Sequence, residues 1–146
     1  MNFVYDDGGR KGTGYVGQAR DCVVRSIAIA TSKPYKEVYD ALNQLAKRER
    51  PRKRSTRSSS RNGVYRRTYE RYLFALGWAW QPTMFIGQGC KIHLCAPELP
   101  SGVLIIRVSK HTTCVIDGTI HDTSDPSRDG RRCVYGYYYK PIQIVL

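Results

Sequence analysis

Long hydrophobic stretches are missing from this chain of 146 residues. No apolar run approaches the roughly 20 residues that a membrane-spanning helix needs. Residues 1–18 also lack the hydrophobic core of a secretory signal peptide. These absences argue against a membrane protein and against a membrane partner, and they predict a cytoplasmic location.

Acidic residues are few as well. Twelve Asp and Glu face 24 Lys and Arg, which gives a formal net charge of +12 at pH 7. The excess is concentrated between Lys47 and Arg71, where eleven basic residues stand against Glu49 and Glu70, a net +9. The remaining +3 is spread over the rest of the chain. One segment therefore sets the basic character of the protein.

Cysteine and histidine are scarce, with five and three copies. An odd number of cysteines in a chain without an export signal predicts free thiols rather than a disulfide framework. A zinc site is an alternative for one group, which consists of Cys90, His93, Cys95 and Cys133. The spacing Cys-x-x-His-x-Cys matches no common zinc finger, and no second paired half follows. We therefore expect no metal and no cofactor.

The composition is that of a folded protein, because 41% of the residues are hydrophobic and 11% are aromatic. The length suits a single domain, residues 1–146. Apolar residues at helical spacing predict three helices, over about 22–31, 32–50 and 64–76. The second helix should fade before Pro51, which cannot continue it.

After Gly77 the pattern changes to short apolar runs that are typical of strands. These runs are WAWQPTMF, KIHLC, GVLIIRVS, HTTCVI, TIHDT, RCVYGYYY and IQIVL. Helices followed by strands predict an α+β fold in which N-terminal helices pack on a C-terminal antiparallel sheet. Outside these elements we expect a loosely held arm at 1–16. The basic, serine-rich stretch 51–63 should form a flexible loop that buries nothing.

Cys22 stands at the start of the first predicted helix, directly after Asp21, a favourable N-cap residue. A thiol in the first turn lies at the positive end of the helix dipole, which favours the thiolate. The alternative is a small buried residue that happens to carry sulfur. A reactive thiol also needs a base, so the rest of the chain decides between the two.

The segment KHTTCVIDGTIHDTSDP supplies two groups that suit such a thiol. The Asp-Gly pair at 117–118 predicts a two-residue hairpin. Pairing outward from this turn makes His111 and Asp122 diagonal neighbours on adjacent strands, within reach of a hydrogen bond. A carboxylate that orients an imidazole prepares it to act as a general base. Cys22, His111 and Asp122 thus form a candidate Cys-His-Asp triad.

This ordered set resembles the papain-like cysteine peptidase superfamily, particularly the small bacterial forms that are similar to bacteriocin-leader peptidases. The matching elements are Gln18, the pair Asp21-Cys22, His111 and the stretch IHDTSDP. The full string also resembles uncharacterised proteins of phages and their bacterial hosts. The likeness to the superfamily implies a papain-like fold over most of the chain.

The resemblance also implies a cysteine-dependent hydrolase, a peptidase or amidase acting on a peptide or protein substrate. Carried over, Cys22 is the nucleophile, His111 the base and Asp122 its orienting group. Gln18 becomes the side-chain donor to the oxyanion, beside the backbone N–H of Cys22. Deamidase and transglutaminase chemistry use the same triad and stay open.

The chain departs from the family pattern in three places. Gln18 lies closer to the cysteine than is usual in the family, and Val23 stands where glycine is frequent. Asp125, rather than Asp122, immediately precedes Pro126. Asp125 is therefore an alternative third member, although the predicted hairpin favours Asp122.

The basic segment 47–71 points to another class of function, a catalytically inactive binding or adaptor protein of phage type. Clustered cations hold the phosphates of a nucleic acid or attract an acidic partner. The candidate residues are Arg52, Lys53, Arg54, Arg57 and Arg61. A solvated loop that contacts no partner is the alternative for this segment.

Overall fold

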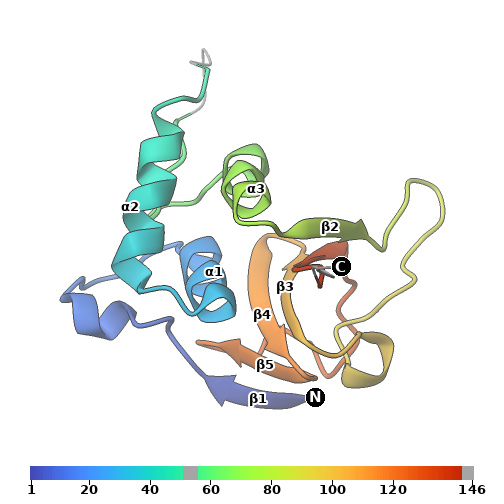
Figure 1. Ribbon diagram of the computed structural model, residues 1–146. Coiled ribbons are helices and arrows are strands. Elements are labelled where there is room, and N and C mark those ends of the chain that lie inside the picture. The colour runs from blue at the N-terminus through green and yellow to red at the C-terminus, as the bar shows by residue number, and fades with distance from the viewer. Residues whose placement is uncertain (51–55, 143–146) are drawn as a thin grey trace.

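A computed structural model describes residues 1–50 and 56–142. Within these residues, helices pack on one face of a six-stranded sheet, which confirms the predicted α+β class (Figure 1). In the described part of the chain, no helix is both long and apolar enough to cross a membrane.

The described residues form three α-helices, which are α1 (Cys22–Thr31), α2 (Tyr35–Ala46) and α3 (Arg66–Ala75). Helix α1 has the predicted bounds, and it buries Val24 and Ile27 almost completely. Helix α2 ends earlier than predicted, because the N–H groups that follow Ala46 donate to carbonyls three residues back. Two short 3-10 helices complete the helical elements, η1 (Arg10–Thr13) and η2 (Ala96–Glu98).

The strands form one sheet in the order β1-β5-β4-β3-β6-β2. Their bounds are β1 (Asn2–Tyr5), β2 (Ala79–Pro82), β3 (Val103–Val108), β4 (His111–Ile116), β5 (Thr119–Asp122) and β6 (Gly136–Tyr139). The hairpin that joins β4 and β5 has the predicted register, with Ile116 opposite Thr119. The Asp-Gly turn therefore positions these two strands as the sequence indicates.

Two predictions about the sheet are wrong. Residues 2–5 do not belong to a loose arm, because they form β1 and pair with β5. This pairing is parallel, so the sheet is mixed rather than antiparallel. All four side chains of β1 are exposed, so the strand depends on backbone pairing at the sheet edge and leaves no buried apolar pattern in the sequence.

Two further runs that were predicted as strands have other outcomes. KIHLC is not a strand, and His93 within it makes only an isolated bridge with Cys133. Leu94 is nevertheless fully buried, which explains why the run is apolar. Most of IQIVL lies outside the described residues.

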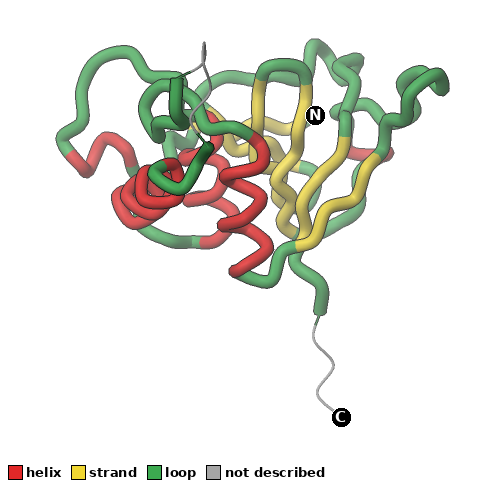
Figure 2. The backbone as a smooth tube through the Cα atoms, turned by 90° about the horizontal axis from the view of Figure 1, so that it is seen from above, coloured by secondary structure: helices red, strands yellow, loops and turns green. Residues whose placement is uncertain are grey.

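Two hydrophobic cores lie on opposite faces of the sheet. Side chains alternate along β3, so Ile105 packs with the helices while Leu104 and Ile106 belong to the second core. Figure 2 shows the helices gathered on one side of the strands. The second core is covered by the long connections that carry Leu94 and Val134.

The serine-rich stretch is more structured than predicted in its described part, 56–63. Ser58 and Ser60 are buried, so the expectation that this stretch buries nothing is wrong. The Ser60 hydroxyl donates to the carbonyl of Tyr39 at 2.6 Å, and its N–H donates to Asn43 at 2.8 Å. Ser60 is buried because backbone and amide groups of α2 satisfy its polar atoms, whereas Ser58 donates to the carboxylate of Glu49, just after α2.

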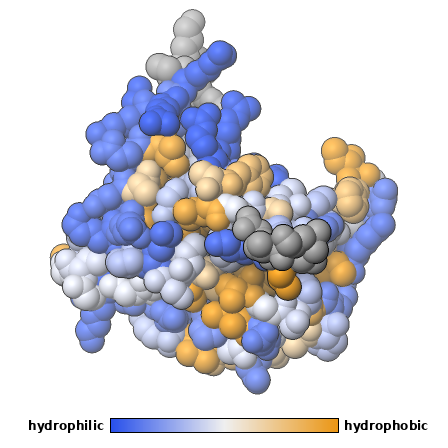
Figure 3. Space-filling model, viewed as in Figure 1, coloured by the Kyte–Doolittle hydropathy of each residue, from blue (hydrophilic) through white to orange (hydrophobic). Residues whose placement is uncertain are grey.

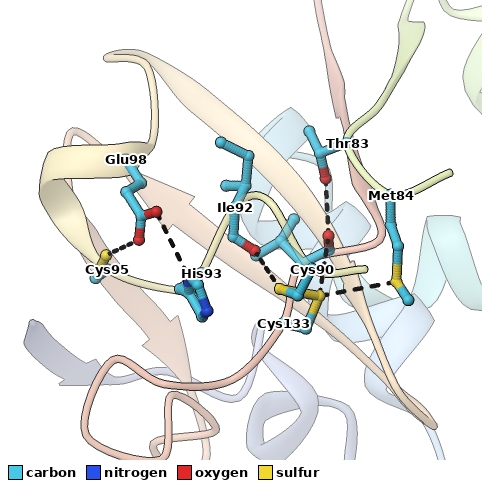
Figure 4. The surroundings of a disulfide bond; sticks show 9 residues. Thr83, Met84, Cys90, Ile92, His93, Cys95, Glu98 and Cys133 are labelled. Carbon is cyan, nitrogen blue, oxygen red and sulfur yellow. Dashed lines mark hydrogen bonds and ion pairs between the residues drawn. A yellow bond between two sulfur atoms is a disulfide. The ribbon is translucent and has the colours of Figure 1, made fainter. Parts of the chain in front are cut away.

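The expectation of five free thiols is also wrong. Cys90 and Cys133 form a disulfide, with their Cα atoms 5.8 Å apart. Figure 4 shows this bond between the segment that carries Ile92 and the strand-like stretch at Cys133. The two residues lie 43 positions apart in the sequence, so only the fold brings them together. Cys22, Cys95 and Cys114 are free.

Candidate active site

Cys22 is the first residue of α1 and lies half-buried where this helix crosses the start of β4. Asp21 occupies the N-cap position, but its side chain caps no N–H of the helix. In the described chain the backbone N–H of Cys22 has no hydrogen-bond partner. The thiol therefore sits beside an unpaired donor at the positive end of the helix dipole.

His111 begins β4 and Asp122 ends β5, so the hairpin places both at the same end of these two neighbouring strands. The Nε2 atom of His111 lies 2.7 Å from a carboxylate oxygen of Asp122, which confirms the predicted contact. Asp125 is exposed, and its carboxylate accepts the N–H of Ser127 at 2.8 Å. Of the two acidic candidates, the fold therefore selects Asp122 as the partner of His111.

The imidazole of His111 lies near the thiol of Cys22, within the range where its hydrogen bonding and its charge act on the thiol. Burial acts to raise the pKa of Cys22, but the hydrogen bond and charge of His111 outweigh it and lower that pKa below 9.0. Burial acts to lower the pKa of His111, whereas Asp122 and the thiol raise it to about 9. These opposite shifts favour a thiolate–imidazolium pair at neutral pH.

The carboxylate of Asp122 is held in its ionised form although its side chain is only 3% exposed. Burial acts to raise its pKa, but the hydrogen bond and charge of His111 lower it overall. The backbone N–H of Thr123 donates to the same carboxylate at 2.7 Å. A buried carboxylate with fixed donors keeps one orientation, and it therefore fixes the orientation of His111.

Arg25 joins the two ends of this site and was not identified from the sequence. Its guanidinium forms an ion pair with Asp21, one helical turn earlier, and lies 3.5 Å from Asp122. The second oxygen of Asp21 accepts the hydroxyl of Tyr35 at 2.6 Å. The spacing of Asp21 and Arg25 by four residues was visible as a helix pair. Only the packing of α1 against the hairpin brings Arg25 to Asp122.

Gln18 lies in the exposed loop before α1. Its backbone carbonyl accepts a hydrogen bond from the guanidinium of Arg61 at 3.3 Å, as does the carbonyl of Val16 at 3.2 Å. No contact between the Gln18 amide and Cys22 is present in the described part of the chain. Arg61, in the serine-rich stretch, thus holds the loop that carries Gln18 by donating to backbone carbonyls of that loop.

The five basic candidates fall into two groups. Arg52, Lys53 and Arg54 lie outside the described residues. Arg57 donates to the carbonyl of Lys47 at 3.2 Å, whereas Arg61 contacts the loop at 16–18. Arg61 therefore has a structural role in addition to its charge.

The residues considered for zinc form other contacts. Cys90 and Cys133 are joined in the disulfide, while His93 and Cys95 both contact Glu98, as Figure 4 shows. Among the described residues no group of three or more His, Cys, Asp or Glu side chains could hold a metal ion.

The other two free thiols differ from Cys22 in their electrostatics. A hydrogen bond to Glu98 raises the pKa of Cys95, and burial raises the pKa of Cys114 to about 12. Cys22 is thus the free cysteine of the described chain whose pKa is lowered. Cys95 and Cys114 therefore serve as internal references when the reactivity of the Cys22 thiol is measured.

Comparison of the chain with protein-family models, with curated proteins and with solved structures gives no match. The functional argument therefore starts from the geometry of the site.

Proposed function

We propose that this protein is a cysteine-dependent hydrolase of papain-like type, most simply a peptidase or amidase. Cys22 is its nucleophile, His111 its general acid and base, and Asp122 the group that orients His111. One observation carries the proposal: the imidazole that lowers the pKa of the Cys22 thiol, at a helix N-terminus, lies 2.7 Å from a buried carboxylate. This arrangement suits nucleophilic catalysis on a carbonyl group.

In the first half of the reaction, the thiolate sulfur of Cys22 attacks the carbonyl carbon of the substrate amide. Asp122 occupies Nε2 of His111, which leaves Nδ1 to face the thiol. As the carbon–nitrogen bond breaks, His111 donates its Nδ1 proton to the leaving nitrogen. An amine departs and a thioester remains on Cys22.

In the second half, neutral His111 accepts a proton from water while the water oxygen attacks the thioester carbon. The carbon–sulfur bond breaks, so the acid product leaves and the thiolate–imidazolium pair is restored. An amine in place of water would give a transglutaminase, and a side-chain amide substrate would give a deamidase.

The negative oxygen that forms in both halves needs donors. The unpaired backbone N–H of Cys22 is the first, since it lies beside the nucleophile at the start of α1. The second is the side-chain amide of Gln18, once substrate binding brings the exposed loop toward the thiol. Arg25 acts as a positioning residue, because it contacts Asp122 rather than substrate.

The first test is the rate of iodoacetamide labelling against pH, read by mass spectrometry at each cysteine. Cys22 should label with a pKa below that of Cys95 and Cys114. His111→Ala should remove most of this advantage, because burial then opposes only the smaller effects of Thr112 and Arg25 on the pKa of the thiol. His121→Ala is the matched control, since His121 lies on β5 of the same hairpin and lies 4.0 Å from Asp6 rather than against the thiol.

The second test incubates the native protein with a peptide mixture and searches for new termini or converted amides, with Cys22→Ala as the blank. Products that disappear in Cys22→Ala identify the reaction class. If Cys22 labels no faster than Cys95 and no product forms, the hydrolase proposal is rejected. A binding protein without catalysis would then be the better description.

A further inference from the structure

A basic cavity of about 640 Å³ lies between the end of α2, the residues at 56–57 and the start of α3. Its lining includes five arginines and one carboxylate, which are Arg48, Arg50, Arg57, Arg67, Arg71 and Glu49. No lysine of the described chain lines it. Figure 3 shows hydrophilic residues gathered over the end of α2.

Most of these arginines lack a counter-charge within the described chain. Arg48, Arg50, Arg67 and Arg71 form no ion pair there. Other cations of the same helices are paired, as Arg66 is with Glu70 at 2.9 Å and Lys36 is with Asp40. On α3, the cations without an ion pair in the described chain are thus the two that line this cavity.

Glu49 offsets only one of the five positive charges of the cavity, and neutral donors hold its carboxylate in place. The N–H of Ser58 donates to it at 2.7 Å, and the hydroxyls of Ser58 and Thr68 donate to it as well. These uncharged donors fix Glu49 as a link between α2, the serine-rich turn and α3. Five arginines against one carboxylate leave the described lining of the cavity with a net charge of +4.

Helix α3 carries an electrostatic cost on this side. Arg67 and Arg71 are four residues apart, where like charges repel each other across one helical turn. The first turn of α3 also has no acidic residue, so the positive end of the helix dipole faces further positive charge. An anion in the cavity would relieve both effects.

We propose that this arginine cavity binds the phosphate backbone of single-stranded nucleic acid. Guanidinium groups pair with phosphate oxygens through two parallel hydrogen bonds. A phosphodiester strand carries one charge per nucleotide on its backbone, so consecutive phosphates can contact several arginines. An acidic peptide carries its charges on flexible side chains, and ordering them costs conformational entropy. A concave cavity receives a flexible strand, whereas a duplex is convex and stiff.

The test is fluorescence anisotropy with a fluorescein-labelled oligothymidylate of about 12 nucleotides, measured between about 50 and 200 mM salt. Arg67→Gln/Arg71→Gln should weaken binding at least about tenfold and lower the salt slope by about 1.4, since each contact to a single strand contributes about 0.7. Arg128→Gln/Arg131→Gln is the matched control with the same change in charge. Both of these arginines are exposed and neither lines the cavity, so binding should stay within about twofold.

Three outcomes would overturn the proposal. The first two are no binding at the lowest salt and an equal loss of affinity in both double variants. The third is that an oligoglutamate of equal charge displaces the labelled oligonucleotide as effectively as unlabelled oligothymidylate does. Equal loss would indicate attraction by net charge alone, and displacement by oligoglutamate would indicate an acidic peptide partner. The cavity shares no residue with the triad, so Cys22→Ala should bind the oligonucleotide normally, and failure of either proposal leaves the other intact.

Discussion

The site around Cys22 and the arginine cavity differ in how their charged groups are paired. Around Cys22 the charges alternate in sign from Asp21 through Arg25 to Asp122 and His111, and each touches its neighbour. In the cavity, five exposed arginines face a single carboxylate, so positive charge remains in excess. The first region is electrostatically complete, whereas the second depends on what binds to it.

This difference in charge pairing indicates how each region functions. Buried groups with fixed partners are already oriented before substrate arrives, which suits chemistry that needs a shifted pKa and a set geometry. Exposed unpaired cations create a field that attracts an anion, and their energy improves only when it arrives. Four changes, of decreasing expected effect, test this contrast between paired and unpaired charge.

Arg25→Gln should be the most damaging change, because it leaves Asp21 and Asp122 buried without their shared cation. We expect a loss of about 4 kcal/mol in the free energy of unfolding, measured by urea denaturation. The labelling pKa of Cys22 should also rise, since the charge of Arg25 helps to lower it. Arg25→Lys keeps the charge and should lose less. A cost for Arg25→Gln below about 0.5 kcal/mol, as is usual for an exposed charge, would erase the contrast.

Reduction of the disulfide tests whether both regions rest on a scaffold that is independent of their charges. The Cys90–Cys133 bond closes a loop of 43 residues, and its loss should lower stability by about 3 kcal/mol. Cys90→Ser/Cys133→Ser is the variant to compare with the oxidised protein by urea denaturation. The labelling pKa of Cys22 and the binding of oligothymidylate should not change. A shift in either would show that the scaffold, rather than local charge, sets that region's properties.

The pH dependence of stability should reveal the thiolate–imidazolium pair. His111 has a raised pKa, so its contribution is present below pH 6.5 and is lost as pH rises toward about 9. Cys22 has a lowered pKa, so its contribution grows as pH rises toward 9.0. The two contributions therefore oppose each other in the native protein.

Cys22→Ala removes the compensating group, so its stability should fall by about 2 kcal/mol between about pH 6 and pH 9. Urea denaturation at both values, with native protein and Cys114→Ala alongside, measures the effect. If the free energy of unfolding depends on pH in the same way for native protein and Cys22→Ala, then Cys22 and His111 are not a coupled pair.

Arg71→Gln should have the smallest effect and the opposite sign. Without a bound anion, removal of the repulsion with Arg67 should stabilise the protein by about 0.3 to 0.5 kcal/mol at low salt. The gain should vanish at about 1 M salt, where exposed charges are screened. Arg66→Gln is the control on the same helix, since Arg66 is paired with Glu70 and its loss should destabilise instead. Destabilisation by Arg71→Gln would mean that this arginine has a partner within the protein.

Much of the candidate site follows from short stretches of sequence. The bounds of α1 follow from its apolar spacing, and the Asp-Gly turn sets the pairing that brings His111 to Asp122. The choice between Asp122 and Asp125 also follows from this turn. Each of these inferences involves residues within about one helix or one hairpin, where geometry depends on a few dihedral angles.

Other parts of the fold could not be read in this way. Strand β1 buries no side chain, so its parallel pairing with β5 leaves no apolar signature. Ser58 and Ser60 are polar residues in a basic stretch, yet both are buried, because Glu49 and a carbonyl of α2 accept their hydroxyls. The disulfide joins a pair of cysteines that the sequence does not distinguish from the other three.

The sequence by itself therefore determined the α+β class, the helix over 22–31, the hairpin and the concentration of charge between Lys47 and Arg71. Only the tertiary structure decided that Arg25 reaches Asp122, that Cys90 meets Cys133 and that five arginines surround one cavity. These two sets of features differ in the distance along the sequence over which their interactions act. Local periodicity and turn chemistry act between neighbouring residues. Contacts across dozens of residues exist only after hydrophobic packing has set the distance between elements.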